Sequence, residues 1–103
     1  MTQGIQQKIK QFGKALEDLG VPFSSLYLFG SNARGTAHEW SDIDVAVVGP
    51  AFAKDRIDET VRLSVIASKI DPAFSPVAMR PEDVQDRFSM IGTAIRKEGI
   101  EIK

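Results

Sequence analysis

Two short apolar runs, joined by a polar segment, constrain this chain more than any other feature of its sequence. The first run, SLYLF, ends at Gly30-Ser31, and the second, IDVAVV, starts directly after Asp42 and contains Asp44. Runs of this length that are rich in aliphatic, aromatic and β-branched residues are typical of β-strands. The sequence therefore predicts two strands whose connecting loop carries a glycine–serine pair at one end and an aspartate pair at the other.

The rest of the chain predicts helices and two further strands around this unit. The spacing of apolar residues predicts helices over 2–19, 55–70, 81–88 and 91–97. Two prolines in 71–79 exclude a helix interior there and favour an edge strand, while 43–48 is expected to be a central strand. A short final strand is expected at 100–103. We expect one domain over 1–103, of the α/β (α+β) class, with a small mixed β-sheet backed by helices mainly on one side.

Composition excludes several kinds of site. A net charge of −1 gives no electrostatic footprint for nucleic acid or for an anionic membrane. The sequence has no cysteine, which rules out disulfides and cysteine-ligated zinc and suits a reducing compartment. No apolar run approaches the roughly 20 residues that span a bilayer. We therefore expect a cytoplasmic protein that binds neither membranes nor nucleic acid directly.

The aspartate pair is a candidate metal site. Residues two apart on a strand point to the same face, about 6.5–7 Å apart, so the carboxylates of Asp42 and Asp44 repel each other unless something compensates them. Mg2+ prefers such a pair together with substrate phosphates, and two ions can support in-line displacement at phosphorus. The alternative is that Ser41 and Asp42 are turn residues at a polar strand entry, because Asp-x-Asp is common by chance.

The glycine–serine pair is a candidate phosphate site. Gly30 lets another group approach the backbone closely, and Ser31 offers a hydroxyl and an N–H at the start of a helical turn. Arg34 follows with a planar guanidinium suited to phosphate. The alternative is a tight strand-to-helix turn with a surface arginine.

A P-loop is excluded for the same segment. Gly30 and Gly35 fit G-x-x-x-x-G, but Thr36 and Ala37 stand where a P-loop requires lysine and then serine or threonine.

The segment GSNARGTAHEWSDIDVAV resembles the G-S-x10-D-x-D signature of the DNA polymerase β-like nucleotidyltransferase superfamily. The short chain, with a helix before its first strand, resembles the minimal nucleotidyltransferase (MNT) branch. The resemblance is strongest over 28–48 and extends more weakly, as an order of elements, over nearly the whole chain. It implies transfer of a nucleoside monophosphate from a nucleoside triphosphate to a hydroxyl, with release of pyrophosphate.

The resemblance also implies residue roles. Those that would hold the triphosphate of ATP are Gly30, Ser31, Asn32 and Arg34. The metal ligands, and thereby the catalytic residues, would be Asp42 and Asp44, binding one or two Mg2+ ions. The superfamily usually supplies a third carboxylate from the next strand, but Ala78 stands near the expected place. Asp71 is the nearest candidate for a third metal ligand, and its alternative role is a turn residue before Pro72.

MNT proteins are commonly paired with helical HEPN proteins. The resemblance therefore implies an antitoxin that transfers AMP from ATP to a hydroxyl, a tyrosine in the family's known mode, of a HEPN toxin. Two alternatives remain open. One is a nucleotide-binding module, catalytically weak or inactive, that neutralises its partner by contact. The other is a small-molecule nucleotidyltransferase whose acceptor cleft is completed by a homo-oligomer.

Overall fold

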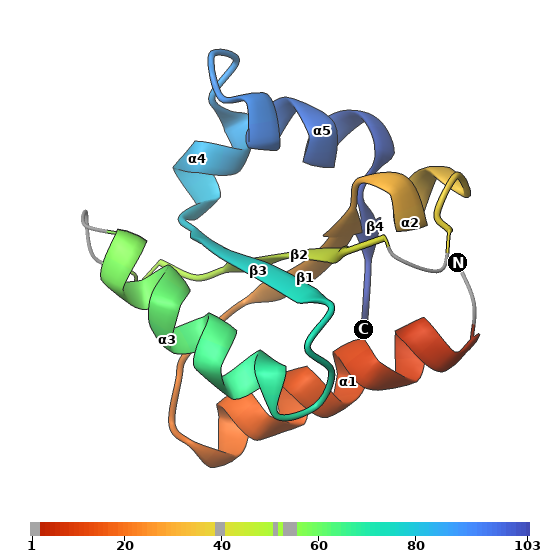
Figure 1. The fold of residues 1–103 in the computed structure, drawn as a ribbon. Coiled ribbons are helices and arrows are strands. Elements are labelled where there is room, and N and C mark those ends of the chain that lie inside the picture. The colour runs from red at the N-terminus through yellow and green to blue at the C-terminus, as the bar shows by residue number, and fades with distance from the viewer. Residues whose placement is uncertain (1–2, 39–40, 51, 53–55) are drawn as a thin grey trace.

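A computed structural model describes residues 3–38, 41–50, 52 and 56–103, and the structural statements below concern these residues. The elements in chain order are α1 (Gln3–Asp18), β1 (Ser25–Phe29), α2 (Ser31–Arg34), β2 (Ile43–Val48), α3 (Arg56–Ser68), β3 (Phe74–Met79), α4 (Pro81–Gln85), α5 (Met90–Glu98) and β4 (Ile100–Glu101) (Figure 1). The predicted helix at 55–70 thus appears as α3, although residue 55 lies outside the described part. The helix predicted from Pro81 to about Phe88 is shorter and ends at Gln85.

The strands form one mixed sheet in the order β3-β2-β1-β4. β1 is antiparallel to both β2 and β4, whereas β2 and β3 are parallel. The prediction of a central strand at 43–48 is confirmed, and so is that of an edge strand within 71–79, where the strand itself covers Phe74–Met79. Pro76 lies in the edge strand β3, which has a neighbouring strand on one side only. On the other side, the missing N–H of proline costs no hydrogen bond between strands.

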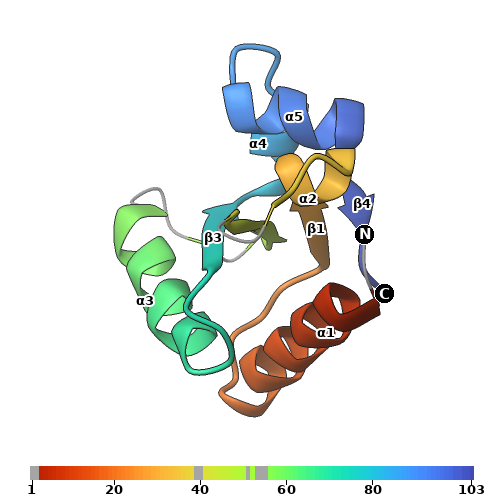
Figure 2. The same ribbon diagram turned by 45° about the vertical axis from the view of Figure 1, so that its right-hand side comes forward.

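Helices cover both faces of the sheet, so the expectation of helices mainly on one side is wrong. α1 and α3 lie on one face and α4 and α5 on the other (Figures 1 and 2). The larger core contains Phe12 and Phe74, whose ring centroids are 5.5 Å apart. The smaller core packs Val84 and Ile95 against alternate residues of β2 and its neighbours. A strand with apolar residues on both faces requires such double cover.

The orientation of α3 differs from the pattern in the sequence. The sequence predicts a wide apolar stripe that faces the sheet, made of a row of Ile57, Val61 and Val65 with Leu63, Ile66 and Ile70 beside it. The three residues of that row are 74%, 57% and 55% exposed. Leu63 and Ala67 are fully buried instead. Because α3 carries apolar residues around much of its circumference, periodicity alone did not determine which side meets β3.

Within the described residues, no helix is both long and apolar enough to cross a bilayer.

Candidate active site

The end of β1 lies directly against the aspartate pair. In the antiparallel register of β1 and β2, Phe29 is opposite Asp44, so Gly30 is the next residue beyond that pair. Gly30 has φ 75° and ψ −156°, a conformation that only glycine adopts readily. A Cβ atom at this position would lie 2.2 Å from Oδ2 of Asp44. Glycine is therefore required here both by the backbone conformation and by the carboxylate beside it.

The turn after β1 is the short helix α2. The N–H groups of Ala33 and Arg34 both donate to the carbonyl of Gly30 at 3.1 Å. The turn ends at Gly35, which has a left-handed conformation and donates its N–H to the carbonyl of Ser31. These bonds hold the glycine–serine turn in one shape beside β2.

Asn32 anchors this turn to the start of β2. Its side chain is buried, and Nδ2 donates a 2.8 Å hydrogen bond to the carbonyl of Asp42. Asn32 does not line the cleft described below. In the structure its side-chain amide therefore positions the backbone that carries Asp42.

The two aspartates differ in their surroundings. Asp42 is exposed, whereas Asp44 is half-buried. Burial raises the pKa of the Asp44 carboxyl, the charge of Asp42 raises it further, and Arg34 partly offsets both effects. An ionised pair here costs free energy, and a bound divalent cation would remove that cost. The donor set of two carboxylates therefore fits Mg2+.

An open cleft of about 600 Å³ is lined by most of the predicted site residues. Its walls include Gly30, Ser31, Arg34 and both aspartates, so the structure brings together most of the set chosen from sequence. A volume of this size is within the usual range for small-molecule and cofactor sites, about 300–1,000 Å³.

Glu98, at the end of α5, also lines this cleft and was missed by the sequence reasoning. Its Oε1 accepts a 2.9 Å bond from Nη1 of Arg34. The available signal was an acidic residue in the last turn of a helix, where the helix dipole disfavours negative charge unless a cation is near.

The residue beside Asp44 on the neighbouring strand is Ser75. The parallel register pairs Asp44 with Ser75 and Val47 with Ala78, and paired residues share a face of the sheet. Ala78 belongs to the larger core on the opposite face, so it was the wrong place to look for a third acid. Among the described residues, no group of three histidine, cysteine, aspartate or glutamate side chains is placed to hold a metal ion.

The carboxylate of Asp71 is bound by Lys8 and by the backbone of Ala73. Its Oδ2 accepts a 2.5 Å bond from Nζ of Lys8 on α1, and its Oδ1 accepts one from the N–H of Ala73 at 2.8 Å. The geometry supports the alternative role of Asp71 as a turn residue before β3 and gives no support to the third metal ligand.

These contacts of Asp71 predict a pH-dependent stability. The hydrogen bond from Lys8, followed by that from Ala73, lowers the pKa of Asp71. A lowered pKa contributes stability that is present above the unfolded value and lost as pH falls through the folded value. Asp71→Asn is expected to cost about 0.5–1 kcal/mol at pH 7.

Denaturant unfolding at pH 7 and at about pH 3, below the ordinary aspartate pKa, would measure this difference, which should shrink at the lower pH. Asp18→Asn is the matched control, since Asp18 pairs with Lys14 on the exposed surface of α1, the helix that carries Lys8. An equal cost of Asp71→Asn at both pH values would contradict the ion-pair explanation.

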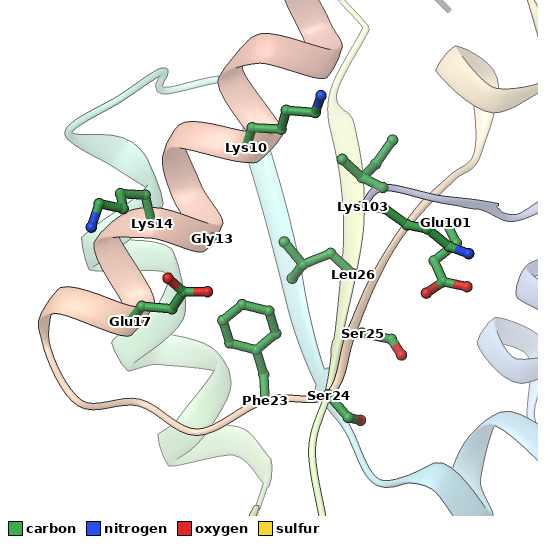
Figure 3. Close-up of a pocket in the computed structure, with 11 residues that line it drawn as sticks. Lys10, Gly13, Lys14, Glu17, Phe23, Ser24, Ser25, Leu26, Glu101 and Lys103 are labelled. Atoms are coloured by element: carbon green, nitrogen blue, oxygen red, sulfur yellow. The ribbon is translucent and has the colours of Figure 1, made fainter.

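A second cavity, of about 440 Å³, lies between α1 and the strands β1 and β4 (Figure 3). Phe23 and Leu26 form its apolar part, and Lys10 and Glu17 are among its charged residues. It contains neither the aspartate pair nor the glycine–serine turn, so the candidate chemistry belongs to the other cleft.

A mixed sheet that presents a glycine–serine turn and an aspartate pair in one cleft is the arrangement expected of a nucleotidyltransferase. The chain belongs to the nucleotidyltransferase domain family, whose profile matches residues 9–90. The resemblance drawn from the sequence is thereby confirmed at the level of this family and fold.

Similar proteins agree with this assignment. A protein of Methanocaldococcus jannaschii, assigned as a protein adenylyltransferase, is 36% identical over 75 residues, which are 69% of this chain and 51% of that protein. The chain therefore spans about half the length of this curated relative.

Solved structures show the same fold. A chain from a crystal structure of a toxin–antitoxin with AMP-PNP is 29% identical, with a TM-score of 0.67, and the match covers 95% of this chain and 72% of that chain. A chain of the toxin–antitoxin MntA-HepT is 24% identical, with a TM-score of 0.61 over 99% of this chain and 72% of that chain. At this identity the second match supports the fold alone.

Proposed function

We propose that this protein transfers AMP from ATP to a hydroxyl group of a protein acceptor, in a reaction that depends on Mg2+. The observation that carries the proposal is how close Gly30 and Asp44 lie within one open cleft, since a Cβ atom added at Gly30 would lie 2.2 Å from Oδ2 of Asp44. The glycine–serine turn, which we propose holds phosphate, therefore lies beside the aspartate pair, which we propose holds Mg2+. The curated relative that is assigned as a protein adenylyltransferase supports a protein as acceptor.

The chain's own residues would act by positioning and charge. Asp42 and Asp44 would hold Mg2+, which supplies positive charge to the phosphates. Gly30, Ser31 and Arg34 would hold the triphosphate through N–H, hydroxyl and guanidinium donors. The acceptor oxygen forms a bond to the α-phosphorus as the bond from that phosphorus to the bridging oxygen breaks. Pyrophosphate leaves. The hydroxyl proton would pass to solvent, because the residue beside Asp44 on the neighbouring strand is Ser75 and not a carboxylate that could accept it.

We further propose that the acceptor is a helical toxin of the HEPN type and that the protein acts as its antitoxin in the cytoplasm. Support comes from the structural relative that is part of a toxin–antitoxin with AMP-PNP. Modification of a tyrosine hydroxyl would then inactivate the toxin covalently.

One observation favours a second candidate function. Because Ser75 is not an acid, the protein can also be read as a binding module that neutralises the toxin by contact, with little or no turnover. Transfer to a small molecule has no separate observation in its favour and ranks below both.

Transfer to a partner protein can be tested directly. The protein is incubated with ATP labelled at the α-phosphate, Mg2+, and a purified helical HEPN-type protein as the proposed partner. We expect label on the partner, the mass of one AMP added to a hydroxyl residue, and loss of both when Mg2+ is chelated. ATP labelled at the γ-phosphate is the control and should leave the partner unlabelled. Neutralisation of the partner without any label would favour the binding module and contradict the enzyme.

A further inference from the structure

Arg34 and Glu98 form an ion pair across the candidate cleft. The two residues come from α2 and α5, are 64 positions apart in sequence, and approach to 2.9 Å. The side chain of Glu98 is only 22% exposed, whereas that of Arg34 is 50% exposed. α2 and the end of α5 lie next to each other in both views of the fold (Figures 1 and 2). The guanidinium proposed to hold phosphate is therefore already bound by a carboxylate.

The charges in the cleft make this contact consequential. The described residues that line the cleft include three carboxylates, those of Asp42, Asp44 and Glu98, and one guanidinium, that of Arg34. A triphosphate would add more negative charge, and the planar donors of arginine fit a carboxylate and a phosphate equally well. Glu98 and a phosphate group would therefore compete for the same donors.

Glu98 is not needed to end its own helix. The last turn of α5 is closed by Gly99, whose N–H donates to the carbonyl of Ile95 at 2.9 Å. Arg96 of the same turn is bound to the carbonyls of Val84 and Asp86 and so does not serve as the cation for Glu98. The negative end of the helix dipole disfavours Glu98, and Arg34 supplies the compensating charge.

We propose that Glu98 sets the affinity of the cleft for triphosphate by competing for Arg34, so that binding requires the guanidinium to exchange its carboxylate partner for a phosphate oxygen. This inference rests on the proposed function, because it concerns the same cleft. It assigns a specificity-determining role to a residue on an element distant in sequence from the glycine–serine and aspartate motifs. A ligand must carry enough phosphate charge to displace Glu98, which favours a triphosphate over a monophosphate.

The test is a double-mutant cycle on binding of AMP-PNP with Mg2+, measured by isothermal titration calorimetry. Glu98→Gln keeps the shape of the side chain but removes its charge. It should tighten binding by about two- to fivefold, the range expected for release from a partly exposed ion pair. Arg34→Gln should weaken binding by about tenfold or more. In the Arg34→Gln background, Glu98→Gln should change affinity little, because there is then no guanidinium for which the carboxylate and the phosphate compete.

Three results would overturn the inference. Unchanged or weaker binding by Glu98→Gln would make Glu98 a support for Arg34 instead of a competitor. Equal tightening with and without Arg34 would reduce the effect to general repulsion. The variant Asp18→Asn removes a carboxylate from the Lys14 pair on α1. If it tightened binding equally, the effect of Glu98→Gln would also be general repulsion. If the wild-type protein binds no AMP-PNP with Mg2+, the proposed function itself fails, which distinguishes that failure from failure of the exchange.

Discussion

The double variant Asp42→Asn, Asp44→Asn is expected to lose AMP transfer by about 10³-fold or more, since removing even a single transition-state donor typically costs about 10²–10³. Asparagine keeps the size of each side chain but removes the charge that would hold Mg2+. The measurement is the initial rate of label transfer from α-labelled ATP at saturating Mg2+. Binding of AMP-PNP should lose its dependence on Mg2+ in parallel.

The same double variant should remain folded. Burial and then the charge of Asp42 raise the pKa of Asp44 in the folded protein. For a carboxyl group with a raised folded pKa, its contribution to stability is present below the unfolded pKa and is lost as pH rises through the folded pKa. At neutral pH without metal, removal of these charges should therefore leave the thermal midpoint unchanged or higher. A rate within tenfold of the wild type, with the fold intact, would refute the catalytic role of the pair.

Gly30→Ala is expected to impair both stability and transfer. The backbone at Gly30 has φ 75° and ψ −156°, and a side chain in that region costs about 1–3 kcal/mol. The added Cβ would also lie 2.2 Å from Oδ2 of Asp44, so the carboxylate or the strand must move. Displacement of a reacting group by about 1 Å can lower a rate by about 10²-fold. Denaturant unfolding and the transfer assay would measure the two effects separately.

Gly35→Ala is the matched control for this prediction. Gly35 ends the same turn with φ 76°, but no atom lies within 4 Å of a Cβ placed there. The substitution should cost about 1–2 kcal/mol through backbone conformation alone and should leave Asp44 in place. Comparable losses of transfer in the Gly30→Ala and Gly35→Ala proteins would show that contact with Asp44 is not the reason for glycine at position 30.

Much of the site followed from the sequence because its parts are local. The glycine–serine turn and the Asp-x-Asp pair are set by residue type and by the two-residue period of a strand, and both lie in the cleft where they were expected. Ser31 and Arg34 lie there as well. Their roles in binding phosphate and metal remain proposals that the variants above address.

Side-chain partners and packing were harder to predict. Asn32 was expected to help hold a triphosphate, and in the structure its side chain donates to the carbonyl of Asp42. Asp71 was chosen for its place before β3, but its partner is Lys8, 63 residues away. The apolar stripe predicted for α3 was wider than the face that is buried: Leu63 and Ala67 are buried, whereas the row of Ile57, Val61 and Val65 is exposed. In each case the local pattern is compatible with more than one arrangement, and tertiary contacts selected one.

The sequence by itself determined the strand pair, the central position of 43–48, the edge position of the proline-containing strand and the placement of glycine and aspartate at the loop ends. These follow from periodicity and from conformations that few residue types adopt. Only the tertiary structure decided that helices cover both faces, that Ser75 is the neighbour of Asp44, and that Glu98 meets Arg34. Such contacts depend on strand register and on the docking of α5, which arise from the summed packing of the whole core and leave no repeat in the sequence.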